Sequence, residues 1–267
     1  MFPRPTFHVP LPGGRTLTLG PRTLVMGIVN VTPDSFADGG LALDPDRAID
    51  AAVRMVAAGA DIVDIGGEST RPGASPLSAD AELRRVEPVL EGLRGRIDVP
   101  VSIDTSKAVV ASRAIDLGAG IVNDVSALAN DPDLPAVVAR RGAAVVLMHS
   151  RGRSADMYQA AVYEDVAAEV AAELDARARA ALAAGIARER IILDPGLGFA
   201  KRPAHTLSAL AGLPHLAGLG YPLLSGPSRK SFLMLAQADL PPEARVWGTA
   251  AAVAASVVLG AHIVRVH

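Results

Sequence analysis

The sequence contains no cysteine, and only 3% of its residues are aromatic. The absence of cysteine excludes disulfide bonds, thiolate metal sites and a cysteine nucleophile, and it is compatible with a reducing cytoplasm, where we expect the protein to act. Half of the residues are hydrophobic, so a large core can form. Because aromatic rings are so few, that core must be built mainly from aliphatic side chains.

The chain has no excess of basic residues, since its formal charge is −2 at pH 7. A nucleic-acid-binding protein needs a basic face, so this balance predicts no nucleic-acid partner, although a local basic pocket stays possible. The most apolar long stretch, 247–266, is interrupted by polar residues, which predicts a buried helix and strand rather than a membrane span. The first twenty residues lack the apolar core of a signal peptide.

Short apolar runs alternate with helical stretches along most of the chain. Eight runs are typical of buried parallel strands because they are continuously apolar, and they cover residues 24–29, 62–65, 99–103, 120–122, 143–148, 191–193, 222–224 and 261–266. The helical stretches cover residues 44–58, 78–93, 106–117, 132–141, 163–184, 204–211, 229–236 and 243–259. This alternation predicts an α/β fold, a (β/α)8 TIM barrel. A doubly wound sheet is the alternative, but the glycine-rich turn typical of it does not follow the first run.

The two ends of the chain frame this barrel. Residues 1–20 predict a β-hairpin, since two short runs flank the turn sequence Pro12-Gly13-Gly14. We expect residues 1–267 to form a single domain, because this length suits one barrel and no linker is evident. His267 follows the eighth run directly, so we expect the last barrel helix to lie in a tail beyond this sequence.

Polar residues end the apolar runs, which is where barrel enzymes carry their chemistry. Asp104, Asn123 and Asp194 directly follow apolar residues, so helix capping does not explain them. Lys230 is one of only three lysines and lies in a Gly/Ser-rich loop, where a compact charge is useful. Other polar residues have a structural explanation as good as a functional one: capping for Thr105, Ser106, Asp124 and Ser228, and burial in the core for His149.

The residue types at the strand ends predict a ligand with two different parts. The carboxylates and amide of Asp104, Asp194 and Asn123 can accept hydrogen bonds from a planar heterocycle, while Lys230 donates to it. Basic residues suited to an anion lie after the second run and at the end of the eighth, namely Arg71, Arg265 and His267. Asn30 offers an oxygen to Mg²⁺, which keeps several waters and binds substrate phosphates. The sequence therefore predicts a heterocyclic diphosphate as the ligand.

Eight sequence blocks together resemble the pterin-binding enzyme family, and within it the dihydropteroate synthases. In chain order they begin at Met26 (MGIVNVTPDSFADGG), Asp64 (DIGGESTRPG), Ser102 (SIDT), Asn123 (NDVS), Leu147 (LMH), Asp194 (DPGLGFAK), Ser228 (SRKS) and Arg265 (RVH). The first two blocks are long and specific, and the set extends to the last residue. Two departures are Ala37, where Ser is common, and Ser150, where the family often has an apolar residue.

The resemblance implies a transferase of folate biosynthesis. It would condense 6-hydroxymethyl-7,8-dihydropterin diphosphate with p-aminobenzoate, with Mg²⁺ as cofactor, to give 7,8-dihydropteroate and diphosphate. The family is thought to react by an SN1-like path, in which diphosphate leaves before the amine attacks. Members commonly form homodimers through late barrel helices, and the Ala-rich stretch 248–258 is compatible with such an interface.

The resemblance also implies roles for residues at matching positions. The pterin would be held by Asp104, Asn123, Asp194 and Lys230, with Met148 against its face. Thr70, Arg71, Arg265 and His267 would bind the diphosphate, with Val266 between them also at the substrate, and Asn30 would hold Mg²⁺. The aminobenzoate pocket would be formed by Phe36, Pro72, Phe199 and Ser231. The residues expected to act in catalysis are Asp38, Arg71, Lys230, Arg265 and His267, with Asp38 helping to close the first loop.

Two other functions remain open. A related pterin-binding methyltransferase would keep the pterin-binding Asp and Asn residues, but it would not need the Ser-Thr-Arg-Pro loop, the Ser-Arg-Lys block or the terminal Arg-Val-His. A catalytically silent paralogue would bind pterins without turnover. Such a protein should have lost residues from the first two loops, and both are intact in the sequence.

Overall fold

The structure is a computed structural model that describes residues 2–32, 44–69, 74–152, 157–234 and 240–267. Eight strands form one parallel sheet in the order β8-β7-β6-β5-β4-β3-β10-β9. Their bounds are β3 Leu24–Asn30, β4 Ile62–Gly66, β5 Val101–Asp104, β6 Ala119–Asp124, β7 Ala144–Met148, β8 Ile191–Asp194, β9 Leu224–Ser225 and β10 Ile263–Val266. A parallel bridge between Leu193 and Leu223 joins β8 to the segment leading into β9, so the sheet closes on itself. The predicted barrel is confirmed.

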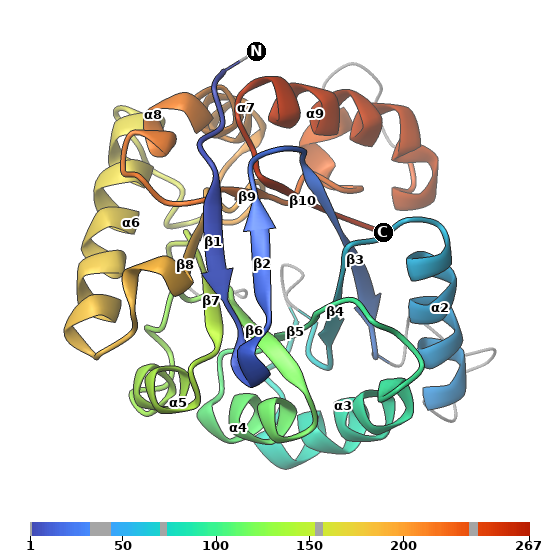
Figure 1. The fold of residues 1–267 in the computed structure, drawn as a ribbon. Coiled ribbons are helices and arrows are strands. Elements are labelled where there is room, and N and C mark those ends of the chain that lie inside the picture. Colours follow the sequence, from blue (N-terminus) through green and yellow to red (C-terminus); the bar gives the residue numbers. More distant parts are fainter. Residues whose placement is uncertain (1, 33–43, 70–73, 153–156, 235–239) are drawn as a thin grey trace.

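Helices surround the barrel in a ring (Figure 1). They are α2 Pro45–Ala57, α3 Ala79–Leu93, α4 Ala108–Asp116, α5 Leu134–Arg141, α6 Val166–Ala183, α7 Pro203–Ala211, α8 Leu213–Ala217 and α9 Val246–Val258. The start of α2 illustrates how the sequence sets these bounds. The Asp44 carboxylate accepts hydrogen bonds from the backbone N–H groups of Asp46 and Arg47, and Pro45 occupies the first helical position, where no N–H is needed.

The seventh β/α unit is less regular than its sequence predicts. The strand β9 has only two residues, and the helix predicted over 229–236 is wrong, because the described part of it contains only the 3-10 turn η3, Ser231–Met234. Arg229 has a φ of 56°, a left-handed conformation in which a right-handed helix cannot begin. The last helical stretch begins with a second 3-10 turn, η4 Pro242–Arg245, before α9.

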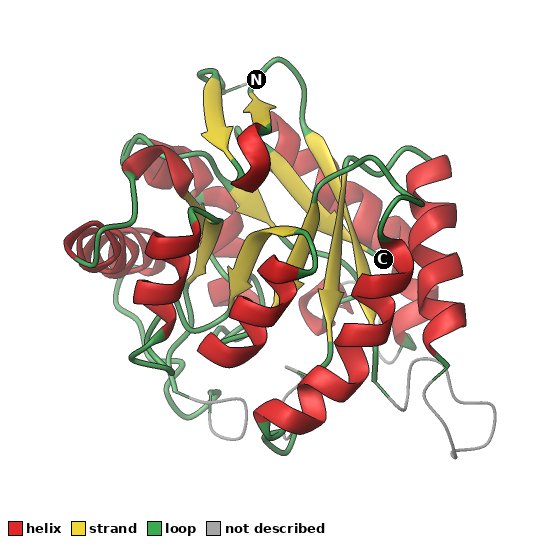
Figure 2. Cartoon of the chain, turned by 60° about the horizontal axis from the view of Figure 1, so that its bottom comes forward, coloured by secondary structure: helices red, strands yellow, loops and turns green. Residues whose placement is uncertain are grey.

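The N-terminal hairpin closes one end of the barrel. Its strands, β1 Phe7–Pro10 and β2 Thr16–Leu19, pair antiparallel around the turn η1, Pro12–Gly14, as predicted. Figure 2 shows the hairpin at the end of the barrel where the parallel strands begin. Hairpin side chains and inward-facing side chains from the first residues of the barrel strands form one apolar cluster: Val9, Leu11, Leu17, Leu19, Leu24, Met26, Ile62, Ile121, Ala144, Val146, Ile192, Leu224 and Ile263.

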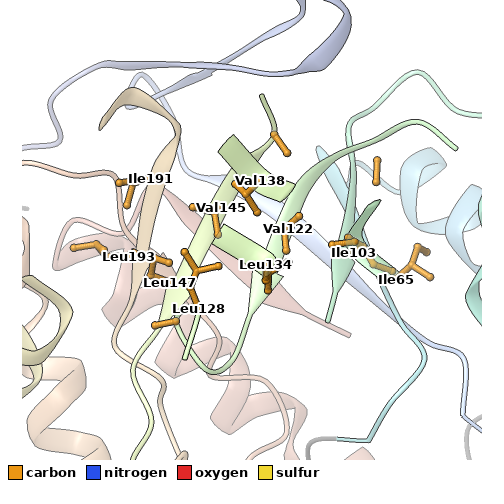
Figure 3. Packing of buried hydrophobic residues seen from close by; sticks show 14 of the residues in the cluster. Ile65, Ile103, Val122, Leu128, Leu134, Val138, Val145, Leu147, Ile191 and Leu193 are labelled. Atoms are coloured by element: carbon orange, nitrogen blue, oxygen red, sulfur yellow. The ribbon is translucent and has the colours of Figure 1, made fainter. Parts of the chain in front are cut away.

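A second, larger cluster lies between the barrel and its helices. Alternate strand residues point outward into it, among them Ile65, Ile103, Val122 and Leu147, which are all fully buried (Figure 3). Helix residues such as Leu134 pack against them. The cluster is dominated by Ala, Val, Leu and Ile, as the low aromatic content predicts. With one end plugged by the hairpin, the other end of the barrel is left for polar side chains.

Candidate active site

Inward-facing positions change from apolar to polar along the strands. In β4 the inward residue Ile62 is followed two positions later by Asp64, and in β6 Ile121 is followed by Asn123. In β8 Ile192 is followed by Asp194. Since side chains alternate along a strand, these polar groups lie directly above the apolar layer, at the carboxyl end of the barrel.

Strand register gathers several predicted residues into one row. Asn30 of β3 pairs with Gly66 of β4, Gly66 with Asp104 of β5, and Asp104 with Asn123 of β6. A Cβ atom added at Gly66 would lie 3.7 Å from Asp104 Oδ2 and 3.8 Å from Asn30 Oδ1. The glycine therefore leaves an open space that is flanked by a carboxylate and an amide oxygen.

Arg265 joins two carboxylates across the barrel. Its Nε donates to Asp64 Oδ2 at 2.6 Å, and its Nη2 donates to Asp104 Oδ2 at 2.7 Å. Asn123 Nδ2 also donates to Asp64 Oδ2, at 3.1 Å. Burial raises the pKa of Asp104 to about 7, while the charge of Arg265 opposes this shift. The guanidinium thus lies beside the predicted heterocycle-binding residues, and its Nη1 has no hydrogen-bond partner among the described residues.

Asp194 has one oxygen committed to the protein and one free within the described chain. Its Oδ1 accepts a hydrogen bond from the backbone N–H of Gly196 at 2.7 Å, and no hydrogen bond to Oδ2 is found among the described residues. Burial raises the pKa of Asp194, and the nearby charge of Lys230 opposes this. Met148 is paired with Asp194 in the strand register and is only 4% exposed. The free oxygen can accept a hydrogen bond from a ligand.

Lys230 approaches Asp194 from the loop after β9. Its ammonium donates to the backbone oxygen of Leu197 and lies 4.5 Å from the centre of the Phe199 ring. Burial lowers the pKa of Lys230 to about 8, while Asp194 and Asp104 oppose the shift. Phe199, predicted to belong to the aminobenzoate pocket, therefore lies directly beneath the charge that is predicted to bind the pterin.

The terminal residues reach the same end of the barrel. His267 Nδ1 and Ser228 Oγ are 3.0 Å apart, so Ser228 contacts the predicted diphosphate-binding histidine. It caps no helix in the described structure, because the turn η3 begins only at Ser231. Val266 is half-buried in β10, and Ser231 is exposed at the start of η3. In contrast, Asp124 holds a turn, because its two oxygens accept hydrogen bonds from the backbone N–H groups of Ser126 and Leu128.

The described residues can offer Mg²⁺ one protein oxygen, that of Asn30. Within the described ranges, no group of three or more His, Asp or Glu side chains could hold a metal ion by itself. Asn30 is half-buried, and its amide has no hydrogen-bond partner among the described residues, so its oxygen is free to bind a cation. A single protein oxygen suits an ion whose other ligands are water and substrate phosphate.

Five predicted residues lie outside the described residues: Phe36, Asp38, Thr70, Arg71 and Pro72. Asp64 is a site residue that was missed. It is fully buried, its Oδ2 accepts hydrogen bonds from Arg265 and Asn123, and its Oδ1 has no hydrogen-bond partner in the described structure. The signal was present, because an acid in the middle of the apolar run 62–65 is costly unless a partner faces it.

Comparison with known proteins identifies the family. A family model described as "Pterin binding enzyme" matches residues 26–267. The dihydropteroate synthase of Synechocystis sp. is 47% identical over 264 residues, which cover 98% of this chain and 91% of that protein. Its counterpart in Escherichia coli K12 is 44% identical over 244 residues, covering 91% of this chain and 86% of that protein.

A solved structure agrees with the sequence relatives. The Xanthomonas albilineans dihydropteroate synthase with 4-aminobenzoic acid has a TM-score of 0.91 and 45% identity, covering 98% of this chain and 93% of that chain. In the part of our chain that the structure describes, no helix has both the length and the apolar content needed to span a membrane. The chain belongs to the pterin-binding enzyme family and, within it, to the dihydropteroate synthases, which are transferases of folate biosynthesis.

Proposed function

We propose that this chain condenses 6-hydroxymethyl-7,8-dihydropterin diphosphate with p-aminobenzoate. The observation that carries the proposal is the set of polar side chains above the apolar layer of the barrel: Asp104, Asn123 and Asp194 at strand ends, with Lys230 from the loop after β9. Carboxylate and amide acceptors together with a cationic donor complement the donors and acceptors on the edge of a pterin ring. The related Xanthomonas albilineans structure with 7,8-dihydropteroate, at a TM-score of 0.87, supports the same substrate class.

The proposed residue roles combine the atoms that have no hydrogen-bond partner within the described site with the positions of the family's sequence blocks. Asp194 Oδ2 and the Asp104 carboxylate would accept from ring N–H and amino groups, and Lys230 would donate to a ring acceptor. Met148 would lie against the ring. Phe199 and Ser231 would line the aminobenzoate side together with Phe36 and Pro72. Thr70 and Arg71 would bind the diphosphate, and Asp38 would help close the first loop against water, the competing nucleophile.

Departure of the diphosphate is the step that needs most help from the protein. The C–O bond of the methylene breaks, and the dihydropterin ring delocalises the resulting positive charge. Arg265 still has Nη1 free of any described partner, so it can donate to the leaving oxygens, and His267 faces the same mouth. Asn30 would hold Mg²⁺, which supplies neutralising charge for the diphosphate.

Bond formation then needs little base catalysis. The aminobenzoate nitrogen is neutral near pH 7, so its lone pair forms the C–N bond and its proton leaves to solvent or diphosphate. Charges fixed in advance around the leaving group can each contribute on the order of 10²–10³ in rate. We also propose that the enzyme acts in the cytoplasm, to which its cysteine-free sequence is suited.

The proposed function is tested by the release of diphosphate from the dihydropterin substrate. We expect Mg²⁺-dependent release that requires p-aminobenzoate. Binding of the pterin without any turnover would instead indicate a silent paralogue. Turnover that needs no aminobenzoate would contradict the proposed condensation.

The ionisation of Lys230 should appear in the pH dependence of catalysis. Its pKa of about 8 means that the ammonium is charged below this pH and neutral above it. We therefore expect kcat/KM for the pterin diphosphate to fall on the alkaline side, since this ratio reports groups of the free enzyme. Lys230→Ala should lower kcat/KM by an amount that corresponds to a loss of about 2–4 kcal/mol in transition-state stabilisation. It should also remove the alkaline decline. Unchanged kcat/KM in the variant would contradict the assignment of Lys230.

We propose that the enzyme is a homodimer that forms through α9. Trp247 is 85% exposed, and it shares one face of this helix with exposed Ala250, Ala254 and Val258. An exposed apolar face of this kind is typical of an interface. Trp247→Glu should convert the dimer to a monomer in analytical ultracentrifugation, while Glu243→Gln, at an exposed position just before the helix, should leave it dimeric. A monomeric wild type at micromolar concentration would contradict the proposal.

A further inference from the structure

Lys201 is the least expected charge in the molecule. It ends the sequence block that begins at Asp194, yet it is only 2% exposed and is among the largest fully buried side chains. Within the described chain it forms no ion pair with a carboxylate. Burial of an ammonium costs several kcal/mol unless its three N–H groups find acceptors.

Four acceptors surround this ammonium. Lys201 Nζ lies 2.8 Å from His149 Nδ1, 3.0 Å from the backbone oxygen of Phe199 and 3.1 Å from that of Gly196, with the His149 backbone oxygen at 3.4 Å. Burial lowers the pKa of Lys201, and attraction by Asp194 opposes the shift. The set of acceptors favours the charged form, because a neutral amine would turn its lone pair toward one of them.

His149 is held as an acceptor by its other nitrogen. Its Nε2 lies 3.1 Å from Glu173 Oε2, and a carboxylate can only accept, so Nε2 carries the proton and Nδ1 presents a lone pair to Lys201. Arg151 Nε donates to Glu173 Oε1 at 3.0 Å and fixes that carboxylate. Burial lowers the pKa of His149, which keeps the ring neutral. A chain of hydrogen bonds thus runs from the surface to the buried ammonium.

The Lys201 contacts connect the loop after β8 to the end of β7. At Gly196, φ is 64°, and an added Cβ would lie 1.9 Å from the His149 backbone oxygen, so the two segments touch through their backbones. Ala200 also has a left-handed φ, of 48°, which costs on the order of 1 kcal/mol for a residue with a side chain. Hydrogen bonds stabilise this conformation: Tyr163 OH donates to the Ala200 backbone oxygen at 3.0 Å. The Lys201 ammonium bonds to the backbone oxygens of Gly196 and Phe199 within the loop, and its contact with His149 attaches the loop to the end of β7.

The same loop carries the groups proposed to bind the pterin. Gly196 donates to Asp194, the Leu197 oxygen accepts from Lys230, and the Phe199 ring lies under the Lys230 ammonium. We propose that Lys201 is a positioning residue that sets the distance between Asp194 and Lys230 by holding this loop on His149. It acts from behind the pocket and does not touch the substrate. The inference rests on the proposed function.

Two substitutions separate positioning from simple loss of stability. Lys201→Met keeps the stem but removes every donor, and Lys201→Gln keeps two N–H donors without the charge. We expect Kd for the pterin diphosphate, titrated without aminobenzoate, to rise 10- to 100-fold in Lys201→Met and less in Lys201→Gln, with KM rising in parallel. His262→Gln is the matched control, because His262 is a buried histidine whose ring bonds to Leu223 and Pro5 near the hairpin.

The control should lower Tm without changing Kd. If Lys201→Met does not fold, Lys201→Gln carries the test with an expected rise of several-fold. A folded Lys201 variant with wild-type Kd would overturn the inference, as would an equal rise in His262→Gln. Failure of the wild type to turn over would instead contradict the proposed function, so the two failures are distinguishable.

Discussion

Asp194→Asn should abolish most of the affinity for the pterin while leaving the protein folded. In the wild type, Oδ1 accepts from Gly196 N–H and Oδ2 has no partner among the described residues. In the variant, the amide oxygen would keep the Gly196 hydrogen bond, and the NH₂ group would face the ring N–H groups of the ligand. Two donors would then oppose each other in a buried site, so we expect Kd to rise about 100-fold or more, roughly 3 kcal/mol.

Asp124→Asn is the control for this substitution. Asp124 is a fully buried aspartate at the end of β6, two strands away from Asp194, but both of its oxygens are bonded within its own turn. Its replacement should lower Tm and leave pterin binding unchanged. Isothermal titration with the pterin diphosphate checks both variants. Wild-type affinity in Asp194→Asn would mean that the pterin binds elsewhere.

Arg265→Gln should impair both stability and catalysis. The substitution removes the only cation bonded to Asp64 and Asp104 in the described structure, and it leaves two buried carboxylates facing each other. Removal of one partner from a buried ion pair costs about 3–5 kcal/mol. Loss of the charge at the leaving group should lower kcat on the order of 10²–10³. Denaturant unfolding and steady-state kinetics measure the two effects.

The stability loss in Arg265→Gln should depend on pH. Burial raises the pKa of Asp104 to about 7 from its ordinary 3.8, and Arg265 opposes this, so the variant should have a still higher pKa. A raised carboxyl pKa means that the folded state binds more protons than the unfolded chain, and stability then falls as pH rises. The variant should therefore recover part of its loss between pH 8 and pH 6.

Arg190→Gln provides the matching control for the pH effect. Arg190 also bonds across elements, but its partners are the backbone oxygens of Pro10 and Gly142, which do not titrate. Its loss should lower stability equally at both pH values. A pH-independent loss in Arg265→Gln would show that the arginine does not compensate Asp104.

The sequence predicts the barrel well because its strands are buried on both faces. Continuous apolar runs such as 143–148 and 191–193 mark β7 and β8 within a residue or two. Polar residues at their ends then lie at the barrel mouth without further information. The seventh unit was harder, because the left-handed conformation of Arg229 has no glycine to signal it.

Contacts across the barrel could not be predicted in the same way. Arg265 and Asp64 are 201 positions apart, and their contact depends on the stagger of all the strands, which a linear pattern does not contain. The sequence therefore indicated the end of the barrel at which Arg265 lies, but not its hydrogen bonds to Asp64 and Asp104. Lys201 was equally hidden, since its acceptors are mostly backbone oxygens that every sequence possesses.

The most direct test of the account is the product formed by the purified chain from both substrates and Mg²⁺. Mass spectrometry should detect 7,8-dihydropteroate and diphosphate in equal amounts, and Asp194→Asn should form far less of both at substrate concentrations that just saturate the wild type. Absence of dihydropteroate from the wild-type reaction, or its undiminished formation by Asp194→Asn, would contradict the assignment of this site to pterin condensation.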